Sequence, residues 1–102
     1  LVPDPVTIPV LAATVGPIVE ESFFRGFLQP WMVANAGALL GVVGTAFCFA
    51  AVHRPVSFLQ ISCFTFMGAA YGFLRLRSGS VLSSMLMHSS YNFAILLMSY
   101  PK

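Results

Sequence analysis

The stretch EESFFRG at residues 20–26 places two acids and one base inside a run that is otherwise apolar from Val6 to Val33. The whole chain of 102 residues has only five basic and three acidic residues, so much of its charge is concentrated here. A carboxylate buried in hydrocarbon is costly unless it is paired, hydrated or protonated. We therefore expect this stretch to carry the function, and the rest of the chain to supply its scaffold and partners.

The composition is typical of a polytopic membrane protein. Hydrophobic residues make up 58% of the chain and charged residues 8%, whereas soluble domains carry about 25% charged residues. We therefore expect a lipid bilayer around the chain. A net charge of +2 without a basic patch argues against nucleic acid as a partner. Cys48 and Cys63 lie in apolar runs without metal-binding spacing, so we interpret them as apolar fillers. Because the chain begins without Met, we expect it to be a segment of a longer protein.

Hydropathy and turn residues predict an all-α fold: a polytopic transmembrane helix bundle with about four antiparallel spans in this segment. Prolines, glycines and charged residues separate the apolar runs. The predicted spans are Val6–Val33, Gly37–His53, Val56–Arg77 and Ser80–Tyr100. Together they are expected to form one membrane-embedded core over residues 1–102.

Prolines and glycines predict details of these helices. Pro17 is expected to kink the first span, and Pro30 to mark its far end. Small residues three or four positions apart allow two helix backbones to approach closely. This spacing occurs in the second span at Gly37, Gly41 and Gly44, and in the third at Gly68 and Gly72.

Polar residues of three different spans are predicted to lie at a similar depth. Counted at ~1.5 Å per helical residue from one membrane surface, Glu20, His53, His88 and Asn92 fall within a slab roughly two helical turns thick. Ionisable residues inside membrane spans are functional by default. We therefore expect these four side chains to meet in one hydrated cavity, although a single intramembrane His or Asn could instead serve as a contact between helices.

Glu21 and Arg25 are four residues apart, so they share one helix face and can form an ion pair. Such a pair neutralises both charges inside the bundle. We interpret Glu21 as a structural anchor, which leaves the neighbouring Glu20 as the candidate base.

These residue types point to hydrolysis. A carboxylate near an imidazole can activate a water molecule, and a second imidazole with an amide can stabilise an oxyanion. No GxSxG motif supplies a serine nucleophile. Glu20, His53 and His88 could instead bind zinc, although the HExxH signature of zinc proteases is absent. Both mechanisms stay open on the residues alone.

Three ordered motifs then resemble a known family. They are EExxxRG at residues 20–26, FxxxH at residues 49–53 and HxxxN at residues 88–92. Together they resemble the CaaX protease and bacteriocin-processing family, also called the Abi family. Residues 68–72 and 77–80 look like its prokaryotic branch. The resemblance covers nearly the whole chain, from about Thr14 to Leu96.

The resemblance implies a multi-pass intramembrane endopeptidase of the glutamate type, in the cytoplasmic membrane if the protein is prokaryotic. By motif position, Glu20 and His53 would activate water, and His88 and Asn92 would form the oxyanion hole. Glu21 and Arg25 would support the site. The mechanism we favour needs no cofactor, and the substrate would be a peptide or protein, prenylated or bacteriocin-like. A non-catalytic membrane scaffold or bacteriocin-immunity protein is the remaining alternative.

Overall fold

The computed structural model describes residues 4–99, and all of its regular structure is helical, as predicted. The helices are α1 (Thr7–Phe23), the π-helix η1 (Phe24–Leu28), α2 (Gln29–Ala36), α3 (Ala38–Val52), α4 (Phe58–Ser78) and α5 (Val81–Ser99). Tyr100, the predicted end of the fourth span, lies outside the described residues.

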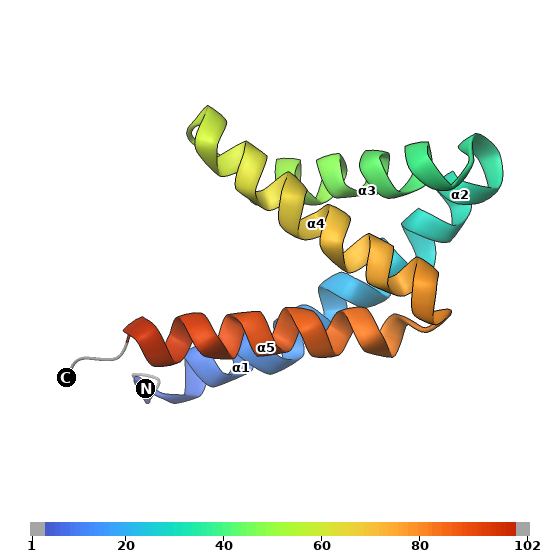
Figure 1. The fold of residues 1–102 in the computed structure, drawn as a ribbon. Helices are drawn as coiled ribbons and strands as arrows, with labels where there is room; N and C mark the ends of the chain where they lie inside the picture. The colour runs from blue at the N-terminus through green and yellow to red at the C-terminus, as the bar shows by residue number, and fades with distance from the viewer. Residues whose placement is uncertain (1–3, 100–102) are drawn as a thin grey trace.

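The helices form two pairs that diverge from a common end. Helix α1 packs along α5, and α3 packs along α4 (Figure 1). The two pairs are joined by η1 and α2 on one path of the chain and by the short turn between α4 and α5 on the other. Contacts of η1 with α3, α4 and α5 place it where the pairs meet.

Two helical runs are long and apolar enough to cross a membrane. They are residues 7–36, which comprise α1, η1 and α2, and residues 81–99, which form α5. Helix α3 is apolar but has only 15 residues. Large apolar side chains cover the outside of the bundle; Val56 and Phe58, for example, are 85% and 86% exposed. Such a surface fits contact with lipid, while the number of spans remains a prediction.

The prediction that Pro30 marks the far end of the first span is wrong. The helical run continues to Ala36, and Pro30 is the second residue of α2. Proline has no N–H, and its ring crowds the carbonyl four residues earlier. The wider π-turn of η1 ends at Leu28, two residues before this proline, and local π-helical turns are one way in which membrane helices accommodate proline. Pro17, by contrast, lies inside the continuous helix α1.

Two glycines with positive φ make the short turns. Gly37 (φ 89°) separates α2 from α3, and Gly79 (φ 72°) ends α4 in the left-handed conformation. Arg54 also has a positive φ of 52°, in the connection that follows α3. Because Pro55 disfavours a helical conformation at the residue before it, Arg54-Pro55 ends α3 as the sequence indicates.

The small-residue spacing corresponds to close helix contacts. A Cβ atom at Gly41 would lie 2.7 Å from the backbone nitrogen of Val33, and one at Gly68 would lie 3.0 Å from the Cα of Ala46. A Cβ atom at Gly72 would collide with the Gln29 side chain. These glycines therefore allow α3 to approach α2, and α4 to approach both α3 and α2.

We expect Gly41→Ala to lower the free energy of unfolding by about 1–3 kcal/mol, because the added methyl group meets backbone that cannot move aside. Gly16→Ala is the matched control: its Cβ would meet no atom within 4 Å, and the better helix propensity of Ala favours the variant. Unfolding in mixed micelles of mild detergent and dodecyl sulfate measures both. Equal stability of the two variants would contradict the close contact at Gly41.

Candidate active site

The carboxylate of Glu20 lies between two imidazoles. Its Oε2 atom is 3.7 Å from Nε2 of His53 and 3.6 Å from Nε2 of His88. The three side chains come from the last turn of α1, the end of α3 and the middle of α5. Glu20 keeps 38% of its side chain exposed, so the carboxylate is accessible. The structure thus brings together three of the four residues predicted to be catalytic.

His53 is held by a backbone carbonyl at the end of α3. Its Nδ1 lies 2.6 Å from the carbonyl oxygen of Phe49. Because a carbonyl can only accept, Nδ1 must carry the hydrogen, and in the neutral ring Nε2 is then an acceptor. The ring also stacks on Phe64, with centroids 4.9 Å apart. The lone pair of His53 is therefore directed toward Glu20.

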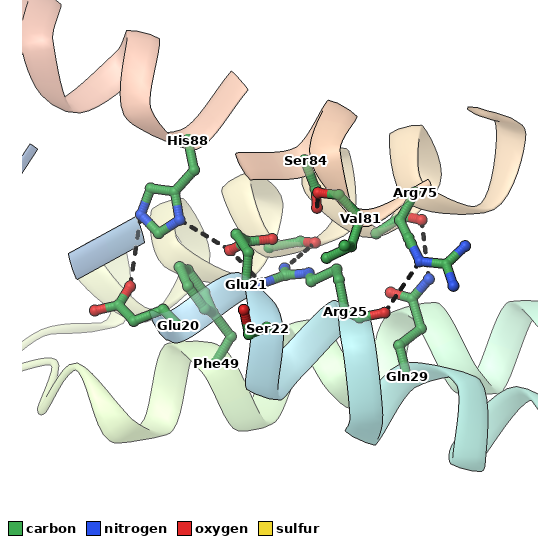
Figure 2. A network of polar contacts seen from close by, with 12 residues as sticks. Glu20, Glu21, Ser22, Arg25, Gln29, Phe49, Arg75, Val81, Ser84 and His88 are labelled. Carbon is green, nitrogen blue, oxygen red and sulfur yellow. Dashed lines mark hydrogen bonds and ion pairs between the residues drawn. The ribbon is translucent and has the colours of Figure 1, made fainter. Parts of the chain in front are cut away.

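His88 is nearly completely buried, with 3% of the residue exposed. Its Nδ1 lies 2.8 Å from Oε2 of Glu21, and its ring stacks on Tyr71 with centroids 4.8 Å apart. An ionised carboxylate only accepts, so Nδ1 of His88 donates to Glu21. The two adjacent acids thus contact opposite nitrogens of the same ring, as Figure 2 shows.

Glu21 and Arg25 form the predicted ion pair, with 3.0 Å between Nη1 and Oε2 and both side chains fully buried. Arg25 also donates from Nη2 to the carbonyl of Gly68, and its guanidinium lies 4.7 Å from the centroid of the Phe49 ring. Buried charges are tolerated when they are paired and hydrogen-bonded in this way. Glu21 is therefore a fixed, compensated charge behind His88.

Asn92 takes a different position from the one expected. Its Nδ2 donates to the backbone carbonyl of Ala12, at 3.3 Å, and it helps to line a groove of about 410 Å³ between α1 and α5. Among the described residues, no hydrogen bond joins Asn92 to Glu20 or to either histidine. The four-residue spacing placed it one turn from His88, but it did not determine where the amide points.

Two polar residues that were not assigned to the site also belong to this network. Gln29 donates from Nε2 to the carbonyl of Gly72, at 3.0 Å, and Arg75 donates from Nε to the carbonyl of Arg25, at 3.1 Å (Figure 2). Gln29 continues the four-residue spacing of Glu21 and Arg25, which was a usable signal. Arg75 carries no comparable signal in the sequence, because its partner is a backbone atom 50 residues away.

The donor set of Glu20, His53 and His88 contains the atom types that zinc prefers. Within residues 4–99, however, no group of three His, Cys, Asp or Glu side chains is arranged to hold a metal ion.

Comparison with known proteins identifies the family. The model of the family described as Type II CAAX prenyl endopeptidase Rce1-like matches residues 3–94, which include every residue of the site above. Neither the curated proteins nor the solved structures gave a match. The family is membrane-embedded, and two helical runs of this chain are long and apolar enough to cross a membrane. The chain therefore belongs to the Rce1-like family of type II CAAX prenyl endopeptidases, which are intramembrane proteases acting on peptide or protein substrates.

Proposed function

We propose that this chain is an intramembrane endopeptidase of the glutamate type, in which Glu20 and His53 activate the attacking water. The position of the Glu20 carboxylate, 3.6–3.7 Å from the Nε2 atoms of His53 and His88, is the observation that carries the proposal. This separation is longer than a direct hydrogen bond, so both pairs can take a shared partner.

Glu20 and His53 both offer acceptors to a water molecule. The water donates one hydrogen to the carboxylate and the other to Nε2 of His53, which keeps its own hydrogen on Nδ1 through the Phe49 carbonyl. The oxygen lone pair is then free to attack the peptide carbonyl. Glu20 takes the proton of the water and later transfers it to the leaving amine, as a general base and then a general acid.

His88 acts as the donor to the oxyanion. Since Nδ1 already donates to Glu21, Nε2 can donate only when the ring carries both hydrogens. Nδ1 of the ring and Nη1 of Arg25 both lie within hydrogen-bond distance of Oε2 of Glu21, so the ring that carries both hydrogens has a carboxylate as its partner. A charged donor aimed at the tetrahedral oxygen stabilises it more than a neutral donor does.

Asn92 is proposed as the second oxyanion donor on the strength of the HxxxN motif. In that role its amide would exchange the Ala12 carbonyl for the substrate oxygen. We assign the substrate chain to the groove between α1 and α5 that Asn92 lines, because Asn92 follows His88 by one turn of α5.

The substrate class and the membrane topology are part of the same proposal. The substrate is a membrane-presented peptide or protein, either prenylated or bacteriocin-like. The chain forms a single multi-pass core over residues 1–102 with about four spans, in the cytoplasmic membrane if the source is prokaryotic. The exposed apolar side chains of α3 and α4 support their contact with lipid.

We expect Glu20→Gln and His53→Ala each to reduce kcat/KM for a membrane-presented peptide by about 10²-fold or more. The amide of Gln cannot take the proton of the water, and Ala removes the imidazole that accepts the other hydrogen. Asp4→Asn, the same chemical change at an exposed position, is the control and should cleave like the wild type. Cleavage of a fluorescent peptide by purified protein in detergent measures all three.

Retained cleavage in Glu20→Gln would refute the proposed base. If the wild type cleaves no peptide and Glu20→Gln keeps its cellular phenotype, the chain is a scaffold or immunity protein instead.

A metal-free site predicts that chelators leave activity unchanged. Pre-incubation with 1,10-phenanthroline, followed by the same peptide assay and by elemental analysis of the purified protein, tests this. The alternative, a zinc protease that uses Glu20, His53 and His88, requires stoichiometric metal, loss of activity on chelation and recovery with added zinc.

The ion pair behind His88 is expected to be strongly coupled. Arg25→Met removes the guanidinium partner of the buried Glu21, leaves only His88 beside that charge, and should cost about 3–5 kcal/mol of unfolding free energy. Adding Glu21→Gln should recover most of that loss, because the unpaired charge is then gone. Unfolding of the two single variants and the double variant in mixed micelles gives the coupling energy; additive effects would mean that the pair is not the stabilising unit.

A further inference from the structure

The carbonyl oxygen of Arg25 has lost its usual backbone donors. In an α-helix it would accept from the N–H of Gln29, but that N–H bonds to the carbonyl of Phe24 in the π-turn. The next candidate for a π-type bond is residue 30, which is proline and has no N–H. A carbonyl inside an apolar bundle is costly to leave unpaired.

Arg75 of α4 supplies the missing donor. Its Nε lies 3.1 Å from the Arg25 oxygen, and Figure 2 shows the guanidinium reaching across to η1. Helix α4 also holds the Arg25 side chain, which donates to the carbonyl of Gly68. Gln29, one turn further, donates to Gly72 in the same way. Both the backbone and the side chain of Arg25 are therefore fixed on α4.

Arg25 is in turn connected to His88 through Glu21. Its Nη1 lies 3.0 Å from Oε2 of Glu21, the same oxygen lies 2.8 Å from Nδ1 of His88, and Nε2 of His88 faces Glu20. A shift of the Arg25 backbone would move the guanidinium and the carboxylate that orient His88. These contacts connect Arg75 to a ring that it does not touch.

We propose that Arg75 is a positioning residue of the site, which fixes the π-turn by donating from Nε to the Arg25 carbonyl and so keeps His88 in its reactive orientation. Its effect on cleavage rests on the function proposed above, whereas its effect on the orientation of His88 does not.

Two variants, Arg75→Met and Arg75→Gln, distinguish the contribution of the hydrogen bond from the contributions of charge and side-chain volume. The amide nitrogen of Gln stands as many bonds from Cα as Nε of Arg, so Gln keeps the donor without the charge. Met has the same length without a donor. Arg77→Met is the control for loss of a cation near the end of α4, since Arg77 is exposed and has no hydrogen bond or ion pair within residues 4–99; only its contact with the Phe73 ring is lost.

For the peptide assay, we expect Arg75→Met to lower kcat by about 10- to 100-fold with KM little changed, because small misplacements of catalytic groups cost this much. Arg75→Gln should stay within about threefold of the wild type, and Arg77→Met should match it. Arg75→Lys keeps the charge but places its nitrogen one bond further out, so it should recover less activity than Gln.

A second measurement does not depend on catalysis. In protein labelled with ¹⁵N-histidine, the Nδ1–H resonance of His88 reports its bond to Glu21, and Glu21→Gln assigns it. We expect this resonance to shift or broaden in Arg75→Met and to stay in place in Arg75→Gln and Arg77→Met.

Wild-type kcat together with an unmoved His88 resonance in Arg75→Met would overturn the proposal. A wild-type kcat in Arg75→Lys together with a low kcat in Arg75→Gln would also overturn it, because Arg75 would then contribute charge. This comparison does not require Arg75→Met to fold. If the wild type cleaves no peptide but the His88 resonance responds to Arg75→Met, the proposed activity fails and the positioning role stands.

Discussion

The buried ion pair of Glu21 and Arg25 is the contact on which the rest of this structure depends. Both side chains are completely enclosed in a chain with few charges, so each must be compensated within the bundle. Glu21 receives hydrogens from Arg25 and His88, and Arg25 also donates to the carbonyl of Gly68. One pair of charges therefore connects α1, η1, α4 and α5, and the same contacts fix the ring that faces Glu20.

Helix α4 contributes to this site mainly through its backbone. Glycine at positions 68 and 72 leaves room for the side chains of Arg25 and Gln29 to reach main-chain carbonyls, and a Cβ atom at either position would press against them. On the facing helical run, the π-turn before Pro30 leaves the carbonyl of Arg25 without a backbone donor, and the side chain of Arg75 donates to it instead. The glycines of α4 and the proline of α2 thus both contribute to the same interface, in which side chains of each helical run donate to backbone carbonyls of the other.

Much of this arrangement could be predicted from the sequence, because it depends on helical period and depth. The spacing of Glu21 and Arg25 required a shared face. Similar depth predicted that Glu20, His53, His88 and Asn92 would meet; the first three do, whereas the amide of Asn92 contacts the carbonyl of Ala12. The π-turn could not be predicted, since Pro30 is equally compatible with the end of a helix. The orientation of the Asn92 amide and the reach of Arg75 depend on side-chain rotamers and on distant backbone atoms, which no local spacing encodes.

The two neighbouring acids show how one helix can separate two tasks. Adjacent helical residues point in directions about 100° apart, so Glu21 faces the packed interior while Glu20 reaches the partly open side. Glu21 is fully enclosed, and its Oε2 atom already accepts from Arg25 and His88, so this carboxylate is not open to a water molecule or a substrate. Glu20 is accessible and faces two ring nitrogens whose opposite atoms are both engaged. With each Nδ1 occupied, proton exchange at the site is confined to the Nε2 atoms and the Glu20 carboxylate, which is why the proposed water activation assigns the proton to Glu20 rather than to its neighbour.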